Sequence, residues 1–332
     1  MGGMSGEWQG KRVLVTGAGG FIGSHLAERL VREGAKVRAM VRYGSTGRWG
    51  WLDDSPLSKE MEIFAGDIRD SGNVRRAMED CDAVLHLAAL IAIPYSYHAP
   101  DSYVRTNIDG TLNVLEAARL LKTPRVVHTS TSEVYGTALR VPIDEDHPLQ
   151  GQSPYSATKI GADKLAESYY RSFDLPVVTI RPFNTFGPRQ STRAVIPTII
   201  TQALAGSEIR LGSLTPTRDL NYVSNTVDGF LKGASVAGIE GETINLGSGE
   251  EISIGDLANS IVRLVGRDVP IVTEEQRLRP GKSEVNRLLA DNGRAHHRLG
   301  WRPEVSFEQG LKLTIEWMRS HLDRYRTGTY TV

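Results

Sequence analysis

The chain has 332 residues, 40% hydrophobic and 23% charged, which is typical of a globular protein of about two domains with a sizeable core. Its 39 basic and 39 acidic side chains balance, so no overall positive field draws it to nucleic acid or to an anionic membrane. A single cysteine, Cys81, excludes an intramolecular disulfide, and no apolar run reaches the roughly 18 residues of a transmembrane helix, so we expect a cytoplasmic protein.

The first half of the chain alternates β-branched runs with helical patterns. Residues 1–10 lack the apolar segment of a signal peptide, and we expect them to form a flexible leader. Strands are predicted at 11–16, 36–41, 61–65, 83–87, 125–129 and 177–181, and helices at 21–33, 101–121 and 154–173. This alternation predicts an α/β fold, a Rossmann-type doubly wound parallel sheet with right-handed crossovers.

The rhythm changes after residue 181, where prolines and glycines divide the chain into short pieces. Helices return at 223–235, 254–265 and 307–321. We expect residues 11–181 to form a dinucleotide-binding domain. Residues 182–322 are expected to form mainly a smaller, substrate-binding α/β region, with some segments crossing back to the main sheet.

A glycine-rich turn joins the first predicted strand to the first predicted helix. Its sequence, TGAGGFIG at 16–23, gives the backbone freedom for a tight turn and lets N–H groups approach a pyrophosphate. The helix N-terminus adds free N–H donors and the positive end of its dipole. The predicted cofactor-binding residues of this turn are Gly17, Gly19, Gly20, Phe21, Ile22 and Gly23.

The residues after the second and third strands bear on the choice of dinucleotide. NAD usually requires a carboxylate at the end of the second strand, but this chain has Arg42 there. Arg42, with Arg48, can pair with a 2′-phosphate, which favours NADP over NAD. Alternatively, Arg42 is a solvated charge and NAD binds without the usual acid. Asp67 is placed to contact the adenine edge, or to cap the following helix.

Tyr155 and Lys159 lie four residues apart on the helix predicted at 154–173, and therefore on one face. A nearby ammonium favours the phenolate, so we expect Lys159 to lower the pKa of Tyr155. Tyr155 can then take the proton from a sugar hydroxyl as hydride leaves the carbon. A surface Tyr–Lys pair is the plainer alternative.

Seven segments together resemble the extended short-chain dehydrogenase/reductases, the NAD-dependent epimerase/dehydratase group. They are TGAGGFIG at 16–23, GDIRD at 66–70, HLAA at 86–89, NIDGTLNVLEAAR at 107–119, TSTSEVYG at 129–136, YSATK at 155–159 and RPFNTFGPRQ at 181–190. The resemblance implies a tightly bound dinucleotide that is regenerated in each turnover, and a nucleotide-sugar substrate. It adds Ile68, Leu87, Ala88 and Ala89 to the cofactor site and places Asn184 near the substrate diphosphate. It also implies a homodimer in which helices 101–121 and 153–173 form a four-helix bundle.

The segment Thr131-Ser132-Glu133 distinguishes the reactions of this family. The resemblance gives Thr131 the role of holding the reacting sugar oxygen. Once C4 is a ketone, the C5 proton becomes acidic, and a partly desolvated Glu133 can remove it before the C6 hydroxyl leaves. The resemblance indicates that glucose-type dehydratases have an acidic residue at the position of Ser132. Either Glu133 or a water could therefore be the group that protonates the leaving hydroxyl. Glu133 as a mere surface or supporting carboxylate is the alternative.

Four longer stretches resemble dehydratases of the legionaminic-acid pathway, which act on nucleotide-linked N-acetylglucosamine. They are WGWLDDSP at 49–56, RAVIPTIITQALAG at 193–206, LTPTRDLNYV at 214–223 and RLRPGKSEVNRLLADN at 277–292. We therefore expect a 4,6-dehydratase acting on UDP- or GDP-N-acetylglucosamine. Arg193, Arg218 and Arg279 become candidate substrate contacts, although Arg218 and Arg279 can instead form ion pairs with Asp219 or Glu284.

Three other readings stay open. A C4 epimerase needs no base at C5, whereas a C6 decarboxylase needs a cation for the substrate carboxylate. A cofactor-binding protein without chemistry is disfavoured by the intact catalytic set. Asn107 is expected to buttress the active-site helices or to cap a helix. His86 and His128 are expected in the core or beside the cofactor, since no spacing indicates a metal site.

Overall fold

A parallel seven-stranded sheet forms the centre of the computed structural model, which describes residues 6–325. The strands lie in the order β10-β6-β5-β4-β1-β2-β3, and every neighbouring pair is parallel. They span β1 (Arg12–Thr16), β2 (Lys36–Arg42), β3 (Glu62–Gly66), β4 (Ala83–His86), β5 (Val126–Thr129), β6 (Val177–Pro182) and β10 (Thr243–Leu246). The order reverses between β1 and β4, where doubly wound folds bind dinucleotides. The predicted fold class is confirmed.

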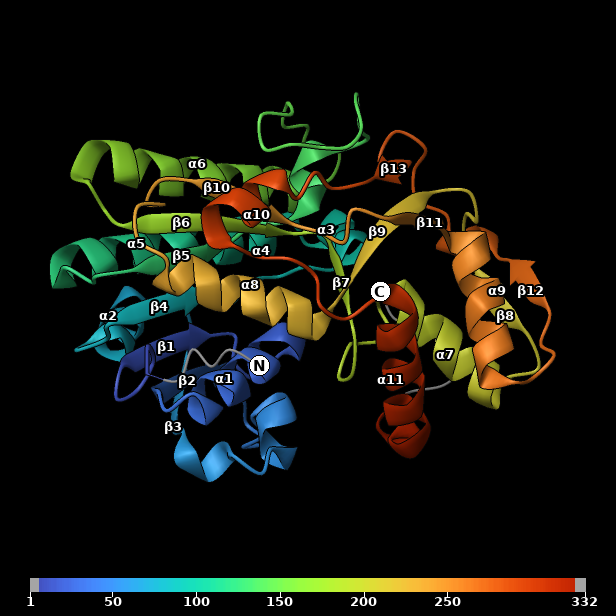
Figure 1. Cartoon of the computed structure of the whole chain (residues 1–332), viewed down its shortest axis with the longest axis horizontal. Coiled ribbons are helices and arrows are strands. Elements are labelled where there is room, and N and C mark those ends of the chain that lie inside the picture. Colours follow the sequence, from blue (N-terminus) through green and yellow to red (C-terminus); the bar gives the residue numbers. More distant parts are fainter. Residues whose placement is uncertain (1–5, 326–332) are drawn as a thin grey trace.

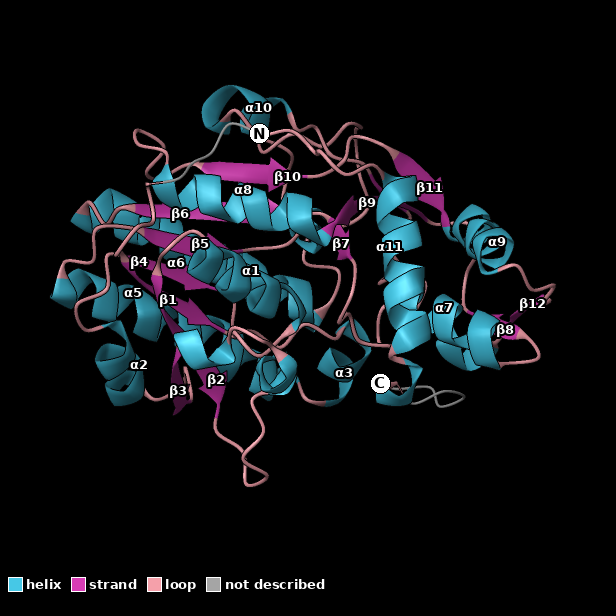
Figure 2. Ribbon diagram, turned by 60° about the horizontal axis from the view of Figure 1, so that its bottom comes forward, coloured by secondary structure: helices cyan, strands magenta, loops and turns pink. Residues whose placement is uncertain are grey.

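Helices cover both faces of this sheet (Figure 2). One face packs against α1 (Phe21–Arg32) and α8 (Val223–Ser235), and its core includes Leu26 and Phe230. The other face packs against α2 (Ser71–Met78), α5 (Gly110–Leu121) and α6 (Pro154–Phe173). A capping box between Ser153 and Ser156 fixes the start of α6 where the sequence predicts it.

A second core lies away from the large sheet, to the right in Figure 1. It is built from α7 (Val195–Ala205), α9 (Ile254–Val265) and α11 (Phe307–Ser320) with small sheets. These sheets contain β7 (Asn184–Phe186), β8 (Ile209–Leu211), β9 (Thr217–Tyr222), β11 (Glu251–Ser253), β12 (Ile271–Thr273) and β13 (Arg287–Leu288). The chain then returns through β10 and α10 (Gly293–Leu299) to the large sheet.

Short helical segments complete the described chain. They are α3 (Ile93–His98), α4 (Pro100–Tyr103) and the turns η1 (Gly50–Asp54), η2 (Ser58–Glu60), η4 (Ser132–Tyr135), η5 (Glu275–Arg277) and η6 (Leu322–Arg324). No helix between residues 6 and 325 has both the length and the apolar character needed to cross a bilayer.

Two local expectations differ from the structure. The prediction of a flexible leader is wrong for residues 6–10, because Trp8 is 4% exposed and packs in the core beside α1. Residues 1–5 lie outside the described chain. The helix predicted at 101–121 is interrupted by a π-helical segment, η3 (Val104–Asp109). Such wide turns are often found at functional sites. Here the segment carries Asn107, which is 1% exposed.

Candidate active site

The glycine turn lies tightly against the end of β4. Gly17 has φ +71°, and a Cβ there would lie 2.9 Å from the backbone nitrogen of Ala88. A Cβ on Gly23 would lie 2.2 Å from the carbonyl oxygen of Gly17. Both positions therefore require glycine, which brings the start of α1 close to the sheet.

The N-terminus of α1 is open to an anion. Its N-cap residue, Gly20, has no side chain, and no acidic residue stands in the first turn. The N–H groups of Phe21, Ile22 and Gly23 have no helical acceptor, as in the first turn of any helix. This cradle fits the pyrophosphate of a dinucleotide.

The segment after β4 is fixed beside this turn. The N–H groups of Leu87 and Ala88 both donate to Thr16 Oγ1 at 3.1 Å, and Ala89 follows them. Thr16 Oγ1 also lies 2.9 Å from His86 Nδ1. Burial lowers the pKa of His86 well below 6.5, so this ring is a neutral core group, in agreement with the sequence.

The ends of β2 and β3 lie at the outer edge of the sheet. Arg42 is exposed there, while Asp67 accepts hydrogen bonds from Arg69 Nε and Nη2. The hydrogen bond from Arg69 lowers the pKa of Asp67. The Ile68 side chain is buried, and its carbonyl accepts from Asn113 Nδ2 at 2.9 Å. Because the Ile68 side chain has no polar atom, any polar contact of this residue with an adenine would come from its backbone.

Thr131, Glu133 and Tyr155 come together at the carboxyl end of β5. Thr131 Oγ1 accepts from the Glu133 backbone N–H at 3.2 Å, and its hydroxyl lies near enough to the Tyr155 phenol to lower the pKa of that phenol. The Glu133 carboxylate is close enough to raise the pKa of Tyr155. Ser132 and Glu133, 2% and 8% exposed, lie in η4, for which Thr131 is the N-cap. The structure thus brings a hydroxyl, a carboxylate and a phenol into one site.

The electrostatic effect expected of Lys159 is not seen. Burial raises the pKa of Tyr155 above its ordinary value of 10, although the nearby Thr131 hydroxyl opposes this. Lys159 Nζ donates to the carbonyl of Thr129 at 2.6 Å. Burial lowers the pKa of Lys159 to about 8, against the opposing charge of Asp163. Lys159 thus lies one turn after Tyr155 on α6, and its hydrogen bond to Thr129 fixes it to the end of β5.

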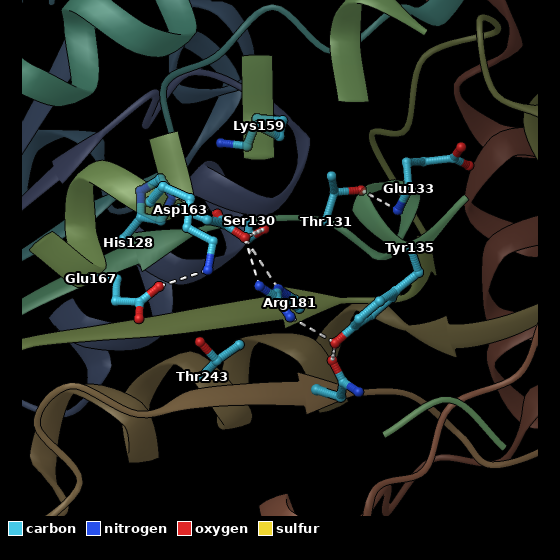
Figure 3. Close-up of polar contacts among 12 residues, drawn as sticks. His128, Ser130, Thr131, Glu133, Tyr135, Lys159, Asp163, Glu167, Arg181 and Thr243 are labelled. Atoms are coloured by element: carbon cyan, nitrogen blue, oxygen red, sulfur yellow. Dashed lines mark hydrogen bonds and ion pairs between the residues drawn. The ribbon is translucent and has the colours of Figure 1, made fainter. Parts of the chain in front are cut away.

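Sequence reasoning missed the buried carboxylate Asp163, one further turn along α6. Its oxygens accept from His128 Nε2 at 3.0 Å, Ser130 Oγ at 2.7 Å and Arg181 Nη2 at 2.9 Å. Figure 3 shows Arg181 between Asp163 and Tyr135, whose hydroxyl it contacts at 2.9 Å. This network ties α6 to β5 and β6. The sequence did carry a signal for Asp163, because residues 155, 159 and 163 are four apart and therefore lie on one face of α6.

We expect Asp163→Asn to lower the free energy of unfolding by about 3–5 kcal/mol, because Arg181 is then buried without its counter-charge. Burial opposes ionisation, but the His128 hydrogen bond and the Arg181 charge lower the pKa of Asp163 from 3.8 to about 2. Its contribution is therefore complete above pH about 4 and is lost as the pH falls through about 2.

Urea unfolding of both proteins between pH 7 and pH 2 measures this. The variant should lose less stability than the wild type over the acid limb. Glu167→Gln is the matched control: it lies one turn further along α6, at the surface, paired with Lys164 and Arg171. Its effect should stay within about 1 kcal/mol. Equal effects of the two substitutions would contradict the role of the buried network.

The predicted substrate-binding residues divide into two groups. Arg218 and Arg279 both face Glu284, with Nη to Oε1 distances of 3.4 and 3.7 Å, so this part of the ion-pair alternative is present. Arg279 Nη1 is nevertheless buried without a hydrogen-bond partner among residues 6–325. Arg193 is exposed, and its charge acts to lower the pKa of Tyr103. It therefore lies near Tyr103.

Asn184 and Asn107 have different surroundings. The side-chain oxygen Oδ1 of Asn184 is buried without a hydrogen-bond partner within the described part of the chain, and such an atom suits a contact with a ligand. Asn107 bonds to both backbone groups of Leu90, at 2.9 and 3.0 Å, and donates to Thr158 Oγ1 at 3.1 Å. Asn107 therefore connects η3, the loop after β4 and α6, as a buttress rather than a cap.

The comparison with known protein families identifies the family of this chain. A family model described as GDP-mannose 4,6 dehydratase matches residues 14–314. The chain belongs to this family of extended short-chain dehydrogenase/reductases. The family is an NAD-dependent epimerase/dehydratase group whose members act on nucleotide-sugars.

Relatives of this chain are named for three different reactions. It is 35% identical over 316 residues to UDP-glucose 4-epimerase of Mycolicibacterium smegmatis, covering 93% of this chain and 99% of the relative. It is 34% identical over 320 residues to UDP-N-acetyl-alpha-D-glucosaminuronate decarboxylase of Bacillus cytotoxicus, covering 93% and 98%. The solved dTDP-glucose 4,6-dehydratase DesIV of Streptomyces venezuelae, with NAD and TYD bound, superposes with a TM-score of 0.85 at 30% identity, covering 95% and 98%. Family membership therefore establishes an enzyme of nucleotide-sugar metabolism and leaves the reaction to the site residues.

Proposed function

We propose that this protein is a nucleotide-sugar 4,6-dehydratase. The observation that carries the proposal is the buried Glu133 carboxylate beside the Thr131–Tyr155 pair. An epimerase needs only the hydroxyl and the phenol, whereas elimination across C5 and C6 needs this further base. Residues 11–181 would serve mainly the cofactor, and residues 182–322 mainly the substrate.

The first step is oxidation at C4. Thr131 orients the C4 hydroxyl, and Tyr155 takes its proton as the C4 hydride departs. The dinucleotide, when bound, supplies the hydride acceptor and returns the hydride to C6. Lys159, whose pKa burial lowers to about 8, would hold the ribose of the dinucleotide. Burial of Tyr155 excludes water from this proton transfer.

The second step is elimination. With C4 oxidised, Glu133 removes the proton from C5, and the C6 hydroxyl leaves with a proton from Glu133 or a water. A solvent proton is then restored at C5, and Tyr155 releases to solvent the proton that it took from the C4 hydroxyl. The overall change is loss of one water, with no net oxidation. Arg218 and Arg279 would hold the substrate diphosphate, and the side-chain amide N–H of Asn184 would donate to the same group.

The proposed substrate is UDP- or GDP-linked N-acetylglucosamine. Its support is the likeness of residues 49–56, 193–206, 214–223 and 277–292 to dehydratases of the legionaminic-acid pathway. A C6 decarboxylase is the second candidate, because the Glu133 and Arg218 charges interact and a guanidinium there can bind a substrate carboxylate.

Turnover in deuterated water tests the reaction. The enzyme is incubated with UDP- or GDP-N-acetylglucosamine, and the product is analysed by NMR and mass spectrometry. We expect a 4-keto-6-deoxy product with deuterium at C5. A product that keeps its 6-hydroxyl with inverted C4 would establish the epimerase instead. Release of CO₂ from a nucleotide-linked glucosaminuronate would establish the decarboxylase.

The exposed Arg42 leads us to propose NADP as the preferred dinucleotide, bound tightly and regenerated in each turnover. Arg42→Ala should then weaken NADP binding by about tenfold and leave NAD binding nearly unchanged, because the lost contact is charge-assisted. Titration of both dinucleotides measures this, with Arg263→Ala, at an exposed arginine of α9 in the second core, as the control. Extraction of NAD alone from the purified enzyme would contradict the preference.

Apolar side chains on the outer faces of α5 and α6 support the proposed homodimer. Leu112 and Leu120 of α5 are 36% and 58% exposed, and Tyr170 and Phe173 of α6 are 38% and 51% exposed. Two copies of this surface would bury them in a four-helix bundle.

A further inference from the structure

Residues 49–51 lie directly on the glycine turn. The Trp51 N–H donates to the carbonyl of Gly19 at 3.0 Å. A Cβ on Gly19 would lie 2.4 Å from the carbonyl oxygen of Trp49, and one on Gly50, whose φ is +70°, would lie 2.3 Å from the Gly19 oxygen. The two backbones are therefore in contact, and this contact fixes the orientation of the Gly19 peptide at the proposed pyrophosphate site.

The short helix η1, which follows Trp49, is held from two sides. Leu52 is fully buried in the core that contains α1 and α8. Trp51 points the other way and packs edge-on against Trp317 of α11, with ring centroids 5.4 Å apart, and lies 6.5 Å from the Tyr325 ring. One turn of helix thus touches both the dinucleotide-binding sheet and the second core.

An ion pair and a cation–π contact complete this connection. The Arg324 guanidinium lies 5.4 Å from the centre of the Trp51 ring and pairs with Asp54. We name the set Trp51, Asp54, Trp317, Arg324 and Tyr325 the aromatic clasp. Its two halves are about 270 residues apart in sequence.

The clasp connects two separately packed parts of the molecule. Helix α11 belongs to the second core through Leu311, Ile315 and Met318, which pack with α7 and α9. Figures 1 and 2 both show α11 between these helices and the large sheet. A second connection runs nearby, from Arg189 Nη2 to Glu28 of α1 at 2.8 Å. The C-terminal helix is therefore fixed to the segment that covers the glycine turn.

We propose that the aromatic clasp is a cofactor-retaining device, in which α11 and η6 hold residues 49–51 over the glycine turn and slow release of the dinucleotide. Its residues are positioning residues: they act through the Trp51–Gly19 contact, not on the substrate. A cofactor that is oxidised and reduced within each turnover has no need to leave, so slow release suits the proposed function. The proposal rests on dinucleotide binding at this turn, whichever sugar reaction follows.

Release of reduced cofactor from the whole enzyme tests the clasp. Protein loaded with NADH, and in parallel with NADPH, is mixed with excess oxidised dinucleotide, and loss of bound-cofactor fluorescence is followed. Trp317→Ala and Arg324→Ala should each speed release about tenfold, which corresponds to about 1.4 kcal/mol. Trp317→Phe keeps a ring against Trp51 and should restore slow release.

Lys312→Ala is the matched control, because it removes an exposed cation from α11 whose partner, Glu308, lies on the same helix. It should release cofactor at the wild-type rate. Arg324 and Asp54 are both exposed, so Arg324→Ala keeps the test available if Trp317→Ala fails to fold. Wild-type release from Arg324→Ala, or equal acceleration in Lys312→Ala, would overturn the clasp. The assay needs no sugar, so an inactive enzyme with clasp-dependent release counts only against the proposed dehydratase.

Discussion

Tyr155→Phe is expected to lower kcat by about 10²–10⁴-fold, because it removes the phenol that the proposed mechanism uses to take the C4 hydroxyl proton, while preserving the ring. The phenol lies near the Thr131 hydroxyl, and Tyr155, Lys159 and Asp163 follow one another at one residue per turn of α6. Since burial raises its pKa, the phenol is protonated at neutral pH until substrate and cofactor charge act on it.

Two signatures separate this loss from simple misfolding. Formation of reduced cofactor, followed at 340 nm in a single turnover, should fall together with kcat, since oxidation is the step affected. Tyr103→Phe is the matched control: its ring packs edge-on against Tyr155 at 6.2 Å, but its hydroxyl donates to the carbonyl of Ala92. The control should change kcat far less. A comparable loss in both variants would remove Tyr155 from its assigned role.

Much of the large sheet follows from local sequence. Each of its first six strands is a β-branched run between turn residues, and the predicted bounds differ from the observed ones by about one residue. The start of α6 was predictable because Ser153 and Pro154 are strong signals for a helix start. Strands β7 to β13 were not predicted, because segments of two to six residues stabilised by long-range pairing leave little periodicity.

The candidate site divides in the same way. Residues that act through fixed spacing, such as the glycine turn and the Tyr155–Lys159 pair, could be found from sequence. The environment of each group could not, because burial depends on segments far away in the chain. Lys159 therefore does not lower the pKa of Tyr155 as expected, and Asp163, bound to Arg181 and His128, was missed. Trp8 was assigned to a leader because a lone aromatic residue gives no periodic signal.

Glu133→Gln should separate the two halves of the proposed reaction. Glutamine keeps the shape of the side chain but cannot accept the C5 proton, so formation of the 4-keto-6-deoxy product should fall by about 10²–10⁴-fold. Oxidation at C4 depends on Thr131 and Tyr155, which the substitution leaves in place. Reduced cofactor should therefore accumulate to a stable level in a single turnover, which wild-type enzyme does not show.

The balance between these two readouts decides between the family's reactions. In an epimerase Glu133 has no proton to take, so Glu133→Gln would leave the interconversion at C4 largely intact. If the protein is a decarboxylase, the Glu133→Gln variant would still oxidise C4 and release CO₂. Glu145→Gln is the matched control: this carboxylate, whose side chain is also largely buried, accepts from the Asn245 N–H at 2.8 Å and pairs with Arg294. Only a dehydratase gives stalled, reduced enzyme in Glu133→Gln together with full elimination in the control, because only there does the C5 proton have to leave through this carboxylate.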